Sequence, residues 1–191
     1  MSGTIRTFLA FDIEEQTILK KLTKAQEMLT STGADLKLVK PQNIHLTVRF
    51  LGDIQQPMVD SIHEEMKHIA FTPFQIELEG LGAFPKPSYP RVVWAGIKKG
   101  ANELKDVFNQ LEPRLRGLGF KPDNKGFSPH LTIARVRTSR NKNRLAELLL
   151  DLENYEFGTV KANCLRLKKS DLTPRGPIYT NLREVCGKQN M

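Results

Sequence analysis

Two short segments carry the residue types that acid–base chemistry on a phosphate ester requires. Residues 45–48 have the sequence His-Leu-Thr-Val, and residues 130–133 have the sequence His-Leu-Thr-Ile. In a β-strand, side chains two residues apart lie on one face, so each segment would present an imidazole and a hydroxyl together. Two facing imidazoles can act as general base and general acid, and the hydroxyls can donate hydrogen bonds to phosphoryl oxygens. We therefore expect His45, Thr47, His130 and Thr132 to be catalytic.

Each motif alone has a simpler interpretation. A single strand histidine is usually half-buried and hydrogen-bonded to a neighbour. The chain has four histidines in all, and two of them stand in matching tetrapeptides. This pairing favours the functional interpretation.

Two other patterns do not predict a site. His63 and His68 resemble the ends of a zinc-protease helix, but a spacing of five residues turns them about 140° apart around a helix. Residues 80–82 (Gly-Leu-Gly) lack the third glycine of a dinucleotide-binding loop, so we predict a turn there. We expect neither a metal nor a cofactor.

Hydrophobic periodicity predicts strands and helices around both motifs. Asp12 is expected to cap the first helix, with Glu15 three residues later. Pro113 could kink the third helix. The elements expected in the first half are a strand over 5–13, a helix whose apolar stripe spans 18–29, a strand over 44–51, a helix opening at Pro57, and strands over 74–79 and 91–97. Those of the second half are a helix over 104–115, a strand over 127–135, a helix over 145–152, and strands near 156–159, 164–168 and 179–185.

The two halves match in their order of elements. A long helix ends about a dozen residues before each motif histidine, and the next helix begins about a dozen residues after it. This match indicates an internal duplication. We expect an α+β fold with two pseudo-symmetric lobes of antiparallel sheet plus helices, in which corresponding positions face each other across a groove.

Length and composition limit the class of protein. A chain of 191 residues suits one bilobal domain over 1–191. The longest apolar runs are far shorter than the roughly 20 residues of a membrane span, and the N-terminus lacks a signal-peptide pattern. A cytoplasmic protein is therefore expected. The net charge of +8 favours a polyanionic partner, although a solvated basic surface would explain it equally well.

The two cysteines, Cys164 and Cys186, are too few for a disulfide framework or a four-ligand zinc site. We predict that both are reduced thiols.

Three segments together resemble a known family. They are residues 6–10 (Arg-Thr-Phe-Leu-Ala), 43–52 (Asn-Ile-His-Leu-Thr-Val-Arg-Phe-Leu-Gly) and 127–135 (Phe-Ser-Pro-His-Leu-Thr-Ile-Ala-Arg). The chain resembles the two-histidine phosphoesterase superfamily over nearly its whole length. Within it, the flanks of the motifs are similar to those of the RNA 2′,3′-cyclic phosphodiesterases once named 2′-5′ RNA ligases.

This resemblance implies a basic central cleft, no metal, and hydrolysis of a terminal 2′,3′-cyclic phosphate on RNA, with tRNA fragments as candidate substrates. It implies that Phe50 stacks on a nucleobase and that Arg135 contacts phosphate. Both lie five residues after a motif histidine, so the strand must end or bulge for them to reach the same face. Core packing for Phe50 and a surface charge for Arg135 are the alternatives.

The resemblance also implies that His130 is the base and His45 the acid, but the near-symmetry of the motifs leaves this assignment open. Two other functions stay open as well. One is the reverse reaction, an ATP-independent 2′-5′ ligation. The other is an RNA 3′-end binding module without chemistry, although such a module would not need both histidines. We expect a monomer.

Overall fold

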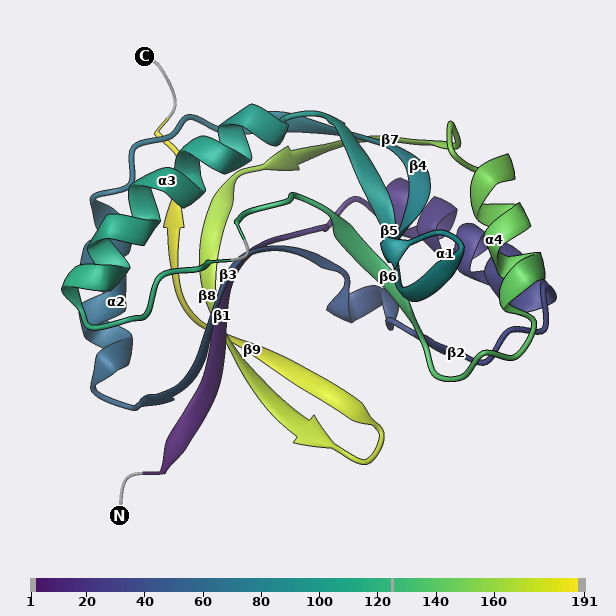
Figure 1. The fold of residues 1–191 in the computed structure, drawn as a ribbon. Coiled ribbons are helices and arrows are strands. Elements are labelled where there is room, and N and C mark those ends of the chain that lie inside the picture. Colours follow the sequence, from purple (N-terminus) through teal and green to yellow (C-terminus); the bar gives the residue numbers. More distant parts are fainter. Residues whose placement is uncertain (1–2, 125, 189–191) are drawn as a thin grey trace.

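The chain folds into two antiparallel sheets, each with two helices beside it (Figure 1). The computed structural model describes residues 3–124 and 126–188. The first sheet has the order β3-β1-β8-β9, with β1 Thr4–Asp12, β3 His45–Gln55, β8 Cys164–Thr173 and β9 Gly176–Cys186. The second has the order β2-β6-β5-β4-β7, with β2 Leu36–Leu38, β4 Phe74–Lys86, β5 Tyr89–Lys99, β6 Leu131–Val136 and β7 Glu156–Ala162. The expected α+β fold with two lobes is confirmed.

The helices divide between the lobes. Helices α2 (Met58–Lys67) and α3 (Ala101–Gly117) contact the first sheet, and α3 also touches β5 of the second, while α1 (Gln16–Ser31) and α4 (Lys142–Asp151) contact the second. A short 3₁₀ turn, η1 (Pro41–Asn43), leads directly into β3. Each lobe therefore contains residues from both halves of the chain, and each sheet contains one of the two motif strands, β3 or β6.

Helix α1 illustrates how the pattern produces the fold. Its apolar positions recur every three or four residues, and Leu22, Ala25 and Leu29 are fully buried against the second sheet. Burial of a leucine side chain contributes about 1.5–3 kcal/mol, so this stripe holds the helix on the sheet. The predicted core-facing stripe is confirmed.

Several local predictions were wrong. Residues 80–82 lie inside β4 rather than in a turn, because β4 and β5 form one long hairpin with irregular register near Leu81. Asp12 does not cap α1; the N-cap is Glu15, and the Asp12 carboxylate binds Lys168 and Arg166 instead. Strand β2 was not expected, since its three residues carry no detectable pattern.

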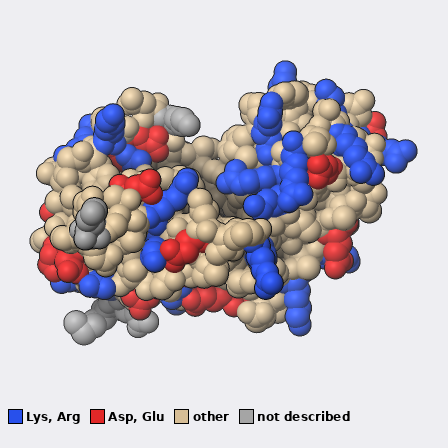
Figure 2. All heavy atoms as spheres, turned by 90° about the horizontal axis from the view of Figure 1, so that it is seen from below, with Lys and Arg blue, Asp and Glu red and all other residues tan. Residues whose placement is uncertain are grey.

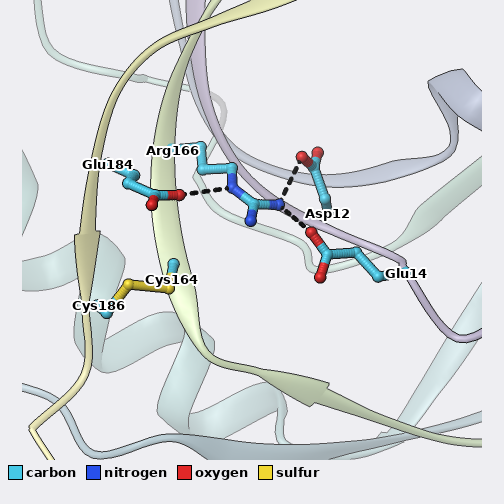
Figure 3. Close-up of a disulfide and its surroundings, with 6 residues drawn as sticks. All are labelled: Asp12, Glu14, Cys164, Arg166, Glu184 and Cys186. Carbon is cyan, nitrogen blue, oxygen red and sulfur yellow. Dashed lines mark hydrogen bonds and ion pairs between the residues drawn. A yellow bond between two sulfur atoms is a disulfide. The ribbon is translucent and has the colours of Figure 1, made fainter.

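The prediction of reduced thiols was also wrong. Cys164 and Cys186 form a disulfide across β8 and β9, close to the ion pairs that Arg166 makes with neighbouring carboxylates (Figure 3). The two cysteines are directly opposed in the register of this hairpin, although 22 residues separate them in sequence. Sequence spacing alone does not reveal that register.

Among the described residues, no helix combines the length and the apolar character needed to span a membrane.

Candidate active site

One cleft of about 570 Å³ brings together all six residues singled out from the sequence. Its lining includes the histidine and threonine of each motif, and in addition Phe50 and Arg135. Figure 2 shows the molecule hollowed between its two parts, with Lys and Arg side chains beside the hollow. Among the residues that the structure describes, five cations line this cleft and no aspartate or glutamate does; the cations are Arg6, Lys37, Lys40, Arg135 and Arg175. Its potential is therefore positive, which attracts anions.

A bulge in β3 explains how Phe50 reaches the cleft. Thr47 pairs with Ala10 of β1, whereas Arg49 pairs with the next residue, Leu9, so Val48 is the extra residue of the bulge. The side-chain alternation shifts by one at this point. Phe50 therefore shares the face of Thr47 instead of pointing away from it, and its side chain is 61% exposed.

Strand β6 repeats the same irregularity at the equivalent position. Thr132 pairs with Trp94 of β5, and Ala134 pairs with the next residue, Val93, so Ile133 is the extra residue. Arg135 consequently comes to the face of Thr132, as Phe50 does in the other lobe. The expected end or bulge is found in both motifs, one residue after each threonine. His130 itself lies just before β6 rather than inside the strand.

His45 is held on both of its ring nitrogens. Nδ1 lies 2.8 Å from the Asn43 carbonyl oxygen, and Nε2 lies 2.9 Å from Oγ1 of Thr47. In the neutral ring, Nδ1–H donates to the carbonyl and the Thr47 hydroxyl donates to Nε2. The rings of Phe8 and Tyr179 pack against the imidazole, with distances of 4.7 and 5.2 Å between ring centroids.

Burial lowers the pKa of His45 from 6.5 to about 4. The hydrogen bond to Asn43 and the Asp12 carboxylate oppose this shift, while the Lys168 ammonium adds to it. In the empty cleft His45 is therefore neutral near pH 7.

His130 is anchored through Nδ1 in the same way as His45, but the two rings differ at Nε2. Its Nδ1 lies 2.7 Å from the Ser128 carbonyl oxygen, and Phe84 packs edge-on against its ring at 4.8 Å. Burial lowers its pKa; the Ser128 hydrogen bond opposes this and the Arg135 guanidinium adds to it. Within the described ranges, no hydrogen bond occupies Nε2 of His130, unlike that of His45.

Sequence reasoning missed two residues that support the site, Gln26 and Tyr179. Gln26 of α1 is 3% exposed, and its Nε2 donates to the carbonyl oxygens of Val39 at 2.7 Å and Ile133 at 2.8 Å. It therefore fixes the backbone of the β6 bulge. A polar residue inside the apolar stripe of α1 was the available signal. Tyr179 carried none, because β9 reaches the cleft through tertiary packing alone.

In the part of the chain that the structure describes, the one group of three potential metal ligands comprises Cys164, Glu184 and Cys186. It lies outside the cleft, and both sulfurs are joined in the disulfide (Figure 3). The residues lining the cleft supply histidine nitrogens, hydroxyls and cations, which is a donor set suited to an anion.

Residues 7–185 match the family model described as AKAP7 2′5′ RNA ligase-like domain. The chain belongs to this family of two-histidine phosphoesterases. An RNA 2′,3′-cyclic phosphodiesterase of Aeropyrum pernix is 42% identical over 86% of this chain and 94% of its own length. A protein of the same name from Methanothermobacter thermautotrophicus is 37% identical over 93% of this chain and 96% of its own.

Solved structures share the fold. E. coli LigT in complex with 3′-AMP aligns with a TM-score of 0.78 at 21% identity, over 98% of this chain and all of that one. A Thermus thermophilus protein, TT0787, aligns with a TM-score of 0.79 at 24% identity, over 97% of this chain and all of that one. At these identities the likeness concerns the fold.

Proposed function

We propose that this protein hydrolyses the 2′,3′-cyclic phosphate at the end of an RNA to a 2′-phosphomonoester, using His45 and His130 as its acid–base pair. The observation that carries the proposal is the pair of imidazoles in one cationic cleft, each anchored through Nδ1 to the carbonyl two residues before it. The names of the relatives support the same activity.

The cleft offers a place for each part of the reacting group. The cyclic phosphate carries one negative charge, shared by its two non-bridging oxygens. Thr47 and Thr132 donate hydrogen bonds to these oxygens, and Arg135 adds a charge-assisted contact. Phe50, exposed at the cleft, stacks on the terminal base.

The reaction is an in-line displacement at phosphorus. One imidazole removes a proton from water, and the water oxygen bonds to phosphorus as the bond to the 3′ oxygen breaks. The other imidazole gives a proton to the departing 3′ oxygen. The products are a 2′-phosphate and a 3′-hydroxyl. At the end of the step the histidine that acted as base carries the additional proton, and the histidine that acted as acid has lost one.

The difference between the Nε2 atoms of the two histidines supports His130 as the base. Nε2 of His130 can accept the proton of water directly, whereas Nε2 of His45 already accepts the Thr47 hydroxyl. When His45 takes up a proton, that hydroxyl is freed to donate to the phosphate. The anionic substrate opposes the effect of burial and raises the pKa of the buried imidazole, which favours this protonated state.

We further propose that the protein acts as a monomer and without metal, on RNA ends such as those of tRNA fragments. The same site run in reverse would ligate a cyclic phosphate to a 5′-hydroxyl. The high concentration of water favours hydrolysis.

The test is incubation with a short oligonucleotide that ends in a 2′,3′-cyclic phosphate, followed by phosphorus NMR of the product. We expect the 2′-phosphate from the wild type and from His63→Ala, a control on α2 outside the cleft. A predominant 3′-phosphate, or an even mixture, would overturn the proposed orientation of the histidines. No hydrolysis at all would overturn the function.

A further inference from the structure

A second, smaller cavity of about 120 Å³ lies where β5 begins and β6 ends, beside the start of α4. Val92 and Arg135 line the cleft, and their immediate chain neighbours Arg91 and Val136 line this second cavity, so both cavities lie near the same ends of β5 and β6, although they share no lining residue. We call the second cavity the basic groove. Its lining comprises Tyr89, Pro90, Arg91, Val136, Arg137, Thr138, Ser139 and Lys142.

Tyr89 holds two cations of the groove in place. The Arg91 guanidinium lies over its ring, 5.1 Å from the centroid, and donates a hydrogen bond of 2.8 Å to its hydroxyl. The Lys142 ammonium lies 5.8 Å from the same centroid. These side chains come from the β4–β5 hairpin and from the start of α4, far apart in sequence. An aromatic ring that contacts both cations attracts them without neutralising their charge.

The cations of the cleft and the basic groove are not neutralised by any carboxylate that the structure describes. Along the described chain, no Lys or Arg that lines the cleft or the basic groove has an ion pair to a carboxylate. Cations of the first lobe, in contrast, are commonly paired, as Arg49 is with Glu112 and Arg166 with Asp12. Within the described ranges, no aspartate or glutamate lines the groove either. Its positive charge is therefore available to an anionic partner.

We propose that the basic groove binds the backbone phosphate of a nucleotide upstream of the reacting end, so that the protein holds an RNA strand and not only its terminal nucleotide. This rests on the proposed function, because the RNA strand would run from the cleft around the ends of β5 and β6 to reach the groove. Arg91 and Lys142 contact the phosphate, with Arg137 adding charge. Since Tyr89 is engaged with the cations, the groove binds the backbone without selecting a base.

The test compares two substrates: a cyclic mononucleotide, which occupies the cleft alone, and a single-stranded hexanucleotide ending in a 2′,3′-cyclic phosphate. The variant is Arg91→Gln/Lys142→Gln. The control, Lys21→Gln/Lys105→Gln, removes the same charge from exposed positions on α1 and α3 that line neither cavity. We expect the groove variant to lower kcat/KM for the hexanucleotide at least tenfold more than for the mononucleotide. The salt dependence of the hexanucleotide reaction should become shallower.

An equal effect on both substrates, or an effect no larger than that of the control, would overturn the groove. Failure of the wild type to hydrolyse either substrate would instead overturn the proposed function. In that case the groove is tested by fluorescence anisotropy with a labelled hexanucleotide that ends in a 3′-hydroxyl. Weaker binding by the groove variant than by the control supports the proposal, and equal binding refutes it.

Discussion

At the scale of single residues, the chemistry depends on where each imidazole carries its proton. Both rings are anchored through Nδ1 to a backbone carbonyl, which leaves Nε2 as the nitrogen that takes part in the proposed proton transfers. In the proposed mechanism, the threonines contribute one hydrogen bond each to the phosphoryl group. These two kinds of contribution differ in size, so they can be separated by substitution.

His45→Ala and His130→Ala should each lower kcat by at least about 10²-fold, because each removes a proton-transfer partner. Thr47→Ala and Thr132→Ala should be milder, by about tenfold, since each loses one hydrogen bond. Steady-state kinetics on a cyclic mononucleotide measures both, with His63→Ala as the control. Near-normal turnover in either histidine variant would refute the two-histidine mechanism.

The pH dependence follows from the same two rings. One must be neutral, which requires a pH above its pKa, and the other protonated, which requires a pH below its pKa. Burial lowers the pKa of both rings in the free protein, that of His45 to about 4. A plot of kcat/KM against pH should therefore be bell-shaped, with its maximum on the acid side of 6.5. A flat profile from pH 5 to 9 would show that the histidines do not titrate in catalysis.

At the scale of elements, the site depends on two equivalent bulges. Each bulge places an extra residue directly after the motif threonine. As a result, the residue three positions after that threonine, Phe50 or Arg135, faces the cleft. Without the bulges, Phe50 and Arg135 would face away from it. The carbonyl of Ile133 at the second bulge is held by Gln26. The support of the site thus extends into α1.

Gln26→Leu should destabilise the protein by about 1–3 kcal/mol, because the carbonyls of Val39 and Ile133 each lose a donor, although that of Ile133 keeps the backbone N–H of Val39. It should also lower kcat/KM, since Thr132 and Arg135 follow the backbone of the bulge. Urea unfolding and kinetics on the folded variant measure the two effects. Gln16→Leu, an exposed position at the start of the same helix, is the matched control and should change neither. Equal stability of the two variants would contradict the role of Gln26.

At the scale of the whole molecule, charge is distributed for binding an anion between lobes. The cations that line the cleft and the basic groove have no ion pair among the described residues, while carboxylates neutralise many cations of the first lobe. The cleft can therefore stabilise a phosphoryl group with hydroxyls and guanidinium groups.

Exhaustive dialysis against EDTA should accordingly leave kcat/KM within about twofold of the untreated protein, because the residues of the cleft supply the charge that a metal would otherwise provide. The control is the same dialysis without chelator. Loss of activity that returns on addition of a divalent metal would contradict the proposed mechanism.

The sequence by itself determined the motifs, the alternation of strands and helices, and the two-lobed α+β fold. These follow from local periodicity, since a strand or an amphipathic helix places its side chains by spacing along the chain. It also indicated that Phe50 and Arg135 required an irregular strand.

Tertiary structure alone decided the rest. The disulfide between Cys164 and Cys186, the bulges at Val48 and Ile133, and the position of Tyr89 between two cations all depend on register or on packing between distant segments. Such register is set by hydrogen bonds to a partner strand. A partner that lies many residues away leaves no trace in local spacing, which is why these features became visible only in the folded chain.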